Sequence, residues 1–280
     1  MKIMDIKDIN WNTVWKEQHE ANINSRGSGD CAMMWSTKEQ AQKFYLMTQE
    51  NPERIDLMLS NFSLSPHKRV LDIGSGPGTL AIPLCEQVAH VTAVEPSFGM
   101  VEVMQDRIRE NSINNLTIVQ KRWEDIDIQK DLNPPYDLVI AANSLGMPDI
   151  QSAIEMMQKV CSGEIWLFWF AGTTNWEKQM NELWPKIHNR PYIASPKSDT
   201  LFHVLYQMGI YPDMQVRDME HTRTYSSLLE AVEDIRGQMN CTNDHDELIK
   251  EFISHELKEQ DGKFIRRGMT KRVSFNWRDR

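Results

Sequence analysis

The chain has 280 residues, of which 40% are hydrophobic and 25% are charged, and its formal net charge is −9. This length allows one large α/β domain or one domain with an added cap. The acidic balance disfavours a protein whose main task is to bind the phosphate backbone of nucleic acid. We therefore expect the partner to be a small-molecule substrate and not a nucleic acid.

The cysteines and the absence of long apolar runs indicate the compartment. Cys31, Cys85, Cys161 and Cys241 are scattered without metal-ligand spacing, so we expect free thiols in a reducing compartment and no metal. The first ten residues lack the apolar stretch of a secretory signal. No apolar run approaches the roughly 20 residues that span a bilayer. The expected location is the cytoplasm, with no membrane partner, and the oligomeric state is left open.

Residues 1–60 are expected to form a helical N-terminal lid. Trp11, Val14 and Trp15 have helical spacing, a polar break follows at residues 26–30, and two more helices are predicted. These helices are expected at 38–47 and 52–60.

Residues 61–280 are expected to form a Rossmann-like, doubly wound and mostly parallel sheet, because strands and helices alternate. Strands are predicted at 69–73, 90–95, 116–121, 136–142 and 164–170, and the helices between them at 79–87, 99–111 and 149–161.

The last third of the chain departs from this alternation and predicts helical C-terminal insertions, with a substrate-side insertion at about residues 172–212. Helices are predicted at 175–187, 200–208, 226–239 and 244–259, a loop at 191–198, and strands at 214–220 and 272–277.

A basic tail from Lys263 to Arg280 runs against the acidic balance of the chain. It has two interpretations: a pair of strands with one solvated face, or a patch that binds nucleic acid. We prefer the pair of strands, because charged residues on a solvated face need no partner.

The most specific motif follows the first predicted strand and reads Asp72-Ile73-Gly74-Ser75-Gly76-Pro77-Gly78-Thr79. Glycine allows positive φ angles and removes the Cβ that would keep a ligand away from the backbone. A dinucleotide fingerprint would need glycine at position 79, and a phosphate-binding P-loop would need a lysine. The pattern therefore fits neither of these two motifs.

A carboxylate, Glu95, ends the second predicted strand and is followed by Pro96 and Ser97. A carboxylate at this position can accept hydrogen bonds from both hydroxyls of a ribose. It can also cap the helix that follows. After this glycine-rich loop we prefer the ribose interpretation.

The run from Asp72 to Gly78 resembles motif I of the class I S-adenosylmethionine-dependent methyltransferases, in which a strand ends in Asp/Glu-x-Gly-x-Gly-x-Gly. The resemblance extends over roughly residues 65–170. It implies that S-adenosylmethionine is the cofactor, that adenine lies beside the end of the third strand, and that the methyl group lies beside the end of the fourth. The implied cofactor-binding residues are Asp72, Gly74, Ser75, Gly76, Gly78, Glu95, Pro96, Trp123, Glu124 and Asn143.

One segment departs from the family pattern. The stretch after the third strand reads Lys121-Arg122-Trp123-Glu124-Asp125, with arginine where the family usually has aspartate. We expect Trp123 to flank the adenine ring and Glu124 or Asp125 to accept from its amino group. The alternative for Trp123 is a buried anchor for the loop.

The sequence Asn133-Pro134-Pro135-Tyr136 matches a motif with which amino-group methyltransferases grip their target amine. In those enzymes it follows the fourth strand, whereas here it precedes that strand. We interpret it as a rigid turn.

The substrate residues are expected among aromatic and polar side chains of the lid and the insertions. The candidates are Arg26, Trp35, Trp169, Tyr192 and His203. Arg26 and Asp30, in the polar break at residues 26–30, are expected to gate the cofactor or to bind a polar group of the substrate, and the alternative is a surface turn. His203 and His221 are candidate general bases, although both histidines also suit packing or surface roles, and no catalytic residue is assigned.

These observations predict a methyltransferase that acts on a small organic molecule by in-line transfer. Two alternatives are a methyltransferase acting on tRNA or on a protein side chain, and a regulatory module that binds the cofactor without catalysis.

Overall fold

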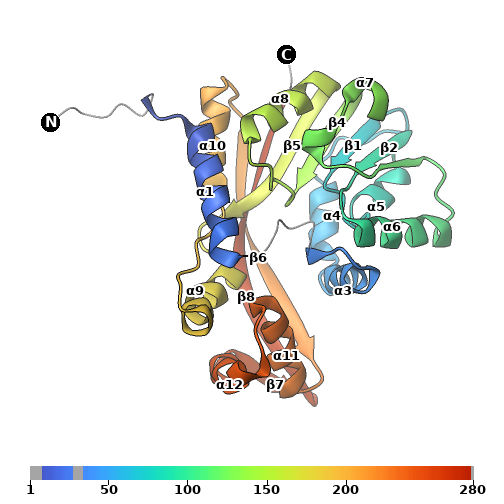
Figure 1. Cartoon of the computed structure of the whole chain (residues 1–280). Helices are drawn as coiled ribbons and strands as arrows, with labels where there is room; N and C mark the ends of the chain where they lie inside the picture. The colour runs from blue at the N-terminus through green and yellow to red at the C-terminus, as the bar shows by residue number, and fades with distance from the viewer. Residues whose placement is uncertain (1–7, 28–33, 279–280) are drawn as a thin grey trace.

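The computed structural model describes residues 8–27 and 34–278, and its centre is one eight-stranded sheet. The strand order is β3-β2-β1-β4-β5-β8-β6, with β7 paired to β8 (Figure 1). The strands are β1 (Arg69–Ile73), β2 (His90–Val94), β3 (Leu116–Val119), β4 (Tyr136–Ala142), β5 (Cys161–Ala171), β6 (Asp213–Tyr225), β7 (Leu257–Gln260) and β8 (Lys263–Arg278).

Strands β1 to β5 are parallel, as the alternation of strands and helices predicts. Apolar side chains on both faces of these strands form two separate clusters, one around Leu71 and Val139 and the other around Val70 and Leu138. The expected Rossmann-like class is thus confirmed. The helices between the strands are α5 (Ala81–Cys85), α6 (Phe98–Glu110), α7 (Ile128–Asp131) and α8 (Ile150–Val160).

The last strands are antiparallel and longer than the sequence pattern predicts. β8 pairs with β5 from Arg278 to Lys271, and its remaining residues, 263–270, continue past the end of β5 paired with β6 and β7. The result is a ribbon that projects from the carboxyl edge of the sheet (Figure 1). In the part of these strands that extends past β5, charged and apolar residues alternate only weakly. The hydrophobic periodicity therefore does not reveal how long the strands are.

Three helices cover this ribbon and form a third apolar cluster, separate from the two clusters of the sheet. They are α9 (Asn175–His188), α11 (Leu228–Met239) and α12 (Asp246–Ser254). The predicted helix 244–259 is therefore too long: it ends at Ser254, and β7 follows. We call α9, α11, α12, β7 and the ribbon residues 219–225 and 263–270 the cap.

The N-terminal helices are divided between the two faces of the sheet. Helix α1 (Trp11–Arg26) packs against α8 and α10 (Ser198–Gln207), whereas α3 (Lys38–Gln49) packs against α6. Helix α4 (Glu53–Leu59) contributes to the same cluster as Val70 and Leu138. The chain therefore passes from one face of the sheet to the other within residues 1–60.

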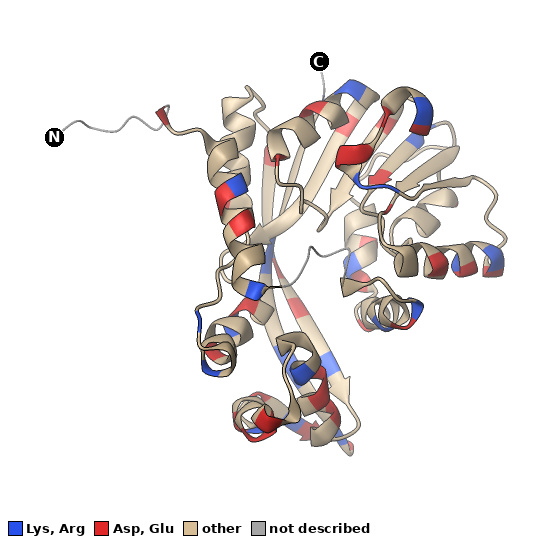
Figure 2. Cartoon of the chain, viewed as in Figure 1, with Lys and Arg blue, Asp and Glu red and all other residues tan. Residues whose placement is uncertain are grey.

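The described basic residues near the C-terminus lie on β8, and most are paired with acids of neighbouring elements, whereas Arg280 lies outside the described residues. Acidic and basic residues are mixed along the ribbon (Figure 2). The expected pairing of strands in this segment is confirmed. The ion pairs are Arg266–Glu256, Arg267–Glu220, Lys271–Asp218 and Arg278–Glu164.

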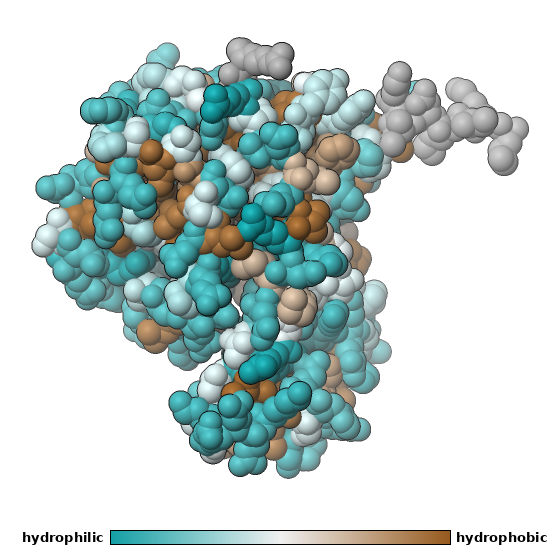
Figure 3. Space-filling model, turned by 180° about the vertical axis from the view of Figure 1, so that it is seen from behind, coloured by the Kyte–Doolittle hydropathy of each residue, from teal (hydrophilic) through white to brown (hydrophobic). Residues whose placement is uncertain are grey.

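The surface seen from behind carries small groups of hydrophobic residues among hydrophilic ones (Figure 3). Within residues 8–27 and 34–278, none of the helices has the length and apolar character needed to cross a lipid bilayer.

Candidate cofactor and substrate site

The glycine-rich loop leaves β1 and is tied to the end of β2 by its backbone. The N–H groups of Gly74 and Ser75 donate to the carbonyl oxygen of Val94, at 2.8 and 3.1 Å. Gly74, Gly76 and Gly78 all have positive φ angles, of 68°, 56° and 76°. The loop therefore adopts a conformation that L-residues with a side chain rarely adopt.

The space around each glycine shows which of them serve internal packing and which one is open to a ligand. A Cβ on Gly74 would lie 2.2 Å from the Cβ of Ser144, and a Cβ on Gly78 would lie 2.9 Å from Cγ of Met104. A Cβ on Gly76 would meet nothing within 4 Å. Gly74 and Gly78 thus permit close packing inside the protein, and Gly76 is the point of the loop where a ligand can approach the backbone.

Glu95 follows β2 and connects this loop to the next helix. Its Oε2 accepts from the N–H of Gly76 and its Oε1 from the N–H of Ser97, both at 2.8 Å. The side chain is buried, which raises the pKa of its carboxyl group, and the two backbone N–H groups act in the opposite direction. A carboxylate can accept about four hydrogen bonds, so these contacts orient Glu95 and leave capacity for two hydroxyls.

Asp72 lies beneath the loop in the middle of the sheet. It is 2% exposed, and its Oδ2 is buried without a hydrogen-bond partner. Burial, followed by the nearby charge of Glu95, raises the pKa of Asp72 to about 7. A buried carboxylate oxygen without a partner fits a cationic, N–H-bearing ligand, and S-adenosylmethionine carries both an ammonium and a sulfonium group. The residues present therefore fit this cofactor.

The expectation for Trp123 needs correction. Trp123 is 2% exposed, belongs to the apolar cluster of the sheet, and donates from its indole nitrogen to the carbonyl oxygen of Ala153 at 3.0 Å. A ring buried in this way anchors its loop and does not form an open wall beside adenine. Glu124 lies next to it on the surface, in the short helical turn Trp123–Asp125.

Sequence reasoning missed one exposed aromatic residue, Phe98. It is 59% exposed and begins α6, three residues after Glu95. The sequence contained a signal for it, because Phe98 follows the expected ribose carboxylate, Glu95, by only three residues. Pro96, between them in sequence, is half-buried.

Asn143 follows β4 and has a left-handed backbone conformation, with φ of 59°. Its N–H donates to the carbonyl oxygen of Phe168 at 2.9 Å, and its side-chain oxygen accepts from Arg272 of β8. The next residue, Ser144, donates to the carbonyl oxygen of Ile73 at 2.6 Å. The end of β4 is thereby tied to β1, β5 and β8 at one edge of the sheet.

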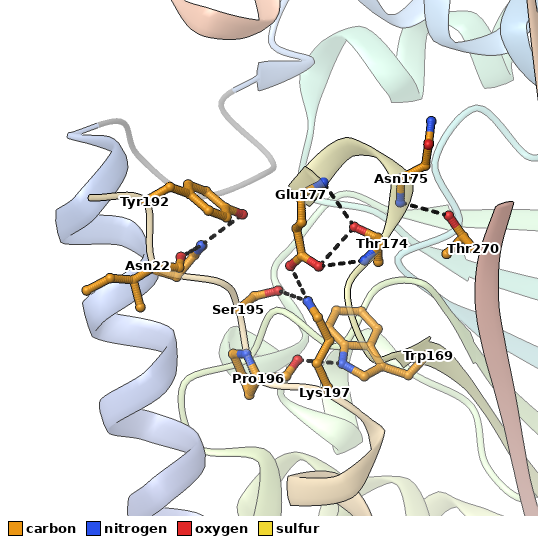
Figure 4. A network of polar contacts seen from close by, with 11 residues as sticks. Asn22, Trp169, Thr174, Asn175, Glu177, Tyr192, Ser195, Pro196, Lys197 and Thr270 are labelled. Carbon is orange, nitrogen blue, oxygen red and sulfur yellow. Dashed lines mark hydrogen bonds and ion pairs between the residues drawn. The ribbon is translucent and has the colours of Figure 1, made fainter. Parts of the chain in front are cut away.

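The structure corrects the role expected for Trp169, which is 7% exposed and donates to the carbonyl oxygen of Pro196 at 2.9 Å (Figure 4). Trp35 packs its ring against Phe44, with centroids 4.9 Å apart, and its carbonyl oxygen accepts from Oγ of Ser97 at 2.6 Å. Trp169 is therefore part of the core, whereas Trp35 holds the N-terminal segment beside the end of β2.

Tyr192 and His203 are both held by neighbouring elements. The Tyr192 hydroxyl accepts from Asn22 of α1 at 3.4 Å (Figure 4). His203 stacks on Trp11, with ring centroids 4.1 Å apart and planes inclined by 18°. This stacking between α10 and α1 agrees with the packing alternative for His203, and its role toward substrate or as a base stays a prediction.

Arg26 ends α1, where its Nε is buried without a partner and its Nη1 lies 3.9 Å from Sδ of Met34. Asp30, the other candidate of this polar break, and Cys31 lie outside the described residues.

The Asn133–Tyr136 motif lies at the amino end of β4, opposite the loop of Asp72 to Gly78. The N–H of Asn133 donates to the Tyr136 hydroxyl at 3.3 Å, and that hydroxyl donates to Oγ1 of Thr92 at 3.2 Å. The motif is thus a turn at the other edge of the sheet, as predicted from its position.

Comparison with known proteins agrees with this geometry. A family model described as a methyltransferase domain matches residues 70–163. An uncharacterized protein of Haemophilus influenzae is 28% identical over 187 residues, which cover 65% of this chain and 67% of that protein. A mitochondrial ribosomal RNA small subunit methyltransferase of Arabidopsis thaliana is 30% identical over 125 residues, 44% of this chain and 30% of that protein.

Solved structures share the fold at low sequence identity. The YcgJ protein of Bacillus subtilis has a TM-score of 0.55 and 16% identity, over 81% of this chain and 97% of that chain. A Haemonchus contortus phosphoethanolamine N-methyltransferase, solved with phosphomonomethylethanolamine and S-adenosylhomocysteine, has a TM-score of 0.53 and 13% identity, over 85% of this chain and 57% of that chain. Residues 70–163 therefore match a methyltransferase domain, and these solved structures show that the chain shares their fold.

Proposed function

We propose that this protein transfers the methyl group of S-adenosylmethionine to a small organic molecule at the carboxyl edge of its sheet. The observation that carries this proposal is the combination of the open space at Gly76, the oriented carboxylate of Glu95 and the unpartnered oxygen of Asp72. Gly76 gives the ligand access to the backbone, Glu95 holds the ribose, and Asp72 faces the methionine part.

The adenine site follows from the residues around Glu95. Phe98 is an exposed aromatic ring that can stack on a base, and base stacking of this kind is worth about 1–3 kcal/mol. Glu124 is exposed near the end of β3 and can accept from the adenine amino group. Phe98 thus takes the role that the sequence assigned to Trp123.

The main contribution that this reaction needs from the protein is to position the reacting groups. The cofactor supplies a methyl group that its sulfonium already activates, so no general base is assigned. Alignment of the reacting atoms alone can lower a barrier by about 7–11 kcal/mol. Asn143 and Ser144 provide this alignment, because their hydrogen bonds fix the end of β4 against β1, β5 and β8.

A small acceptor is favoured over a macromolecule by the charges of the C-terminal strand. Its basic side chains are mostly engaged with acids of this chain, which leaves little free positive charge for a phosphate backbone. The cap and the N-terminal segment are proposed as separate units that border the site on either side. Because some relatives are ribosomal RNA methyltransferases, RNA labelling is one outcome of the test below.

Calorimetric titration of S-adenosylhomocysteine tests the cofactor site. Glu95→Ala is expected to weaken its binding by about tenfold or more, because two ribose hydroxyls lose a charged acceptor. Phe98→Ala is expected to weaken it about fivefold or more through lost stacking. Tyr211→Ala, which removes an aromatic side chain that is 71% exposed, is the control and should bind normally.

Two results would contradict the proposal: no binding by the unaltered protein, or full affinity in Glu95→Ala. The acceptor class is then tested with methyl-labelled S-adenosylmethionine and a cell extract. Label in the small-molecule fraction supports the proposal, and label confined to RNA or protein overturns the choice of acceptor.

A further inference from the structure

A cavity between α4 and the antiparallel strands combines several cationic side chains with an apolar floor. It adjoins the carboxyl edge of the sheet, because Arg272, in its wall, donates to the side chain of Asn143 at the end of β4. The cationic residues are Arg54, Arg217 and Arg272, and the apolar ones include Leu57, Met58 and Phe168.

Arg272 is the most constrained of these arginines. Its Nη1 is bonded to Asn143, its guanidinium carbon lies 4.7 Å from the centroid of the Phe170 ring, and its Nε is buried without a hydrogen-bond partner. Burial, followed by the charge of Arg54, lowers the pKa of Arg272 to about 9. The protein therefore holds a cation under conditions that disfavour its charge.

The titratable neighbours of this cavity leave its positive charge uncompensated. His221 of β6 has a buried Nε2 without a partner, and its pKa is lowered to about 4 by burial and then by Arg272, Arg54 and Arg223. Arg223 is paired with Asp234. Among the described residues, no ion pair joins Arg54 or Arg272 to an acid.

Buried charges without partners are costly and are retained mainly where they act on a ligand. We propose that Arg54 and Arg272 bind an anionic group, a carboxylate or a phosphate, of the methyl acceptor. The contact with Asn143 sets that group beside the end of β4, and the apolar floor receives the body of the molecule. This inference rests on the proposed function and narrows the acceptor to anionic molecules.

The anionic group that Arg54 and Arg272 bind could also come from the cofactor, whose methionine part carries a carboxylate. The two sources predict different behaviour in one variant, Arg272→Met, which removes the charge while keeping an apolar side chain over Phe170. If the acceptor is the source, this variant should keep its affinity for S-adenosylhomocysteine and lose affinity for small anions. If the cofactor is the source, affinity for S-adenosylhomocysteine should fall.

The experiment uses inorganic phosphate and benzoate as probes, titrated into the full chain by calorimetry. The unaltered protein is expected to bind at least one of them, and Arg272→Met and Arg54→Met should weaken that binding about tenfold or more, because a charge-assisted contact is lost. Arg267→Met is the matched control, since Arg267 lies on the same strand, is 64% exposed and is paired with Glu220. It should bind normally.

Two further measurements separate a binding role from a structural one. Arg272→Met should melt within a few degrees of the unaltered protein, because the lost contact with Asn143 is offset by the removal of an unpaired cation from a cationic cluster. Bound phosphate or benzoate should raise the pKa of His221 in an NMR titration, since the anion offsets the charges that lower it.

The inference is overturned if neither anion binds, if Arg272→Met binds both with full affinity, or if this variant loses S-adenosylhomocysteine while Arg267→Met retains it. A failure of the proposed function has a different signature. The unaltered protein would then not bind S-adenosylhomocysteine, whereas Arg272-dependent binding of phosphate or benzoate would still support the anion site.

Discussion

Asp72 is buried where its negative charge is unfavourable, so the stability of the protein should depend on pH in a way that can be tested. The pKa of the Asp72 carboxyl group is near 3.9 in the unfolded chain and about 7 in the folded protein. Between these two pH values, the folded protein therefore binds more protons than the unfolded chain. Its stability should therefore fall as pH rises from about 4 to about 7. The upper limit of this loss is about 4 kcal/mol, because one pKa unit corresponds to about 1.4 kcal/mol.

Asp72→Asn should flatten this part of the stability profile, since the amide does not titrate. Urea denaturation of both proteins between about pH 4.5 and about pH 8 measures the effect. Two parallel profiles would show that Asp72 is not protonated in this range.

Two glycines of the same loop should respond differently to alanine. Gly74→Ala places a Cβ 2.2 Å from that of Ser144, so we expect a loss of stability of about 2 kcal/mol or more. Gly76→Ala meets no atom within 4 Å and carries only the cost of its positive φ angle, about 1–2 kcal/mol. It should instead weaken S-adenosylhomocysteine binding about tenfold or more, because the new methyl group lies where the ligand approaches.

Urea denaturation and calorimetry together check this contrast. Unchanged affinity in Gly76→Ala, with the fold intact, would exclude the loop as the place of close contact with the ligand.

At the scale of elements, the start of α9 depends on a buried ion pair. Glu177 is fully buried, accepts from the backbone and hydroxyl of Thr174, and pairs with Lys197 in the loop before α10 (Figure 4). This network joins the cap to the sheet domain.

Lys197→Met should destabilise the protein by about 3–5 kcal/mol, because it leaves the carboxylate of Glu177 buried without its cation. Lys186→Met is the comparison: its ion pair with Glu182 lies on the surface of the same helix α9, so the expected change is below about 1 kcal/mol. Equal effects of the two substitutions in urea denaturation would show that the buried pair has no special role.

At the scale of the whole molecule, the N-terminal segment docks beside the cofactor site through close backbone contact. A Cβ on Gly99 of α6 would lie 2.3 Å from the carbonyl oxygen of Thr37 and 2.6 Å from that of Trp35. Only glycine permits this approach, which is why α3 can begin next to the end of β2.

Gly99→Ala should displace residues 35–37, increase hydrogen exchange at the start of α3 and lower S-adenosylhomocysteine affinity. Gly237→Ala on α11 meets nothing within 4 Å and should stabilise its helix by about 0.5–1 kcal/mol without affecting binding. Unaltered hydrogen exchange in Gly99→Ala would contradict the docking role.

The sequence by itself determined the parallel half of the fold and the place of the glycine-rich loop. Its strands are short apolar runs with helices between them, and the loop uses glycines at positive φ angles that other residues rarely adopt. These are local properties, so they can be read along the chain.

Only the tertiary structure decided which aromatic rings are buried, how far β6 and β8 extend, and that arginines of α4 and β8 meet beside Asn143. Trp123 and Trp169 are equally apolar in the sequence whether they pack inward or face a ligand. Burial and the convergence of charges depend on contacts between residues distant in the chain, and hydrophobic periodicity contains no information about such contacts.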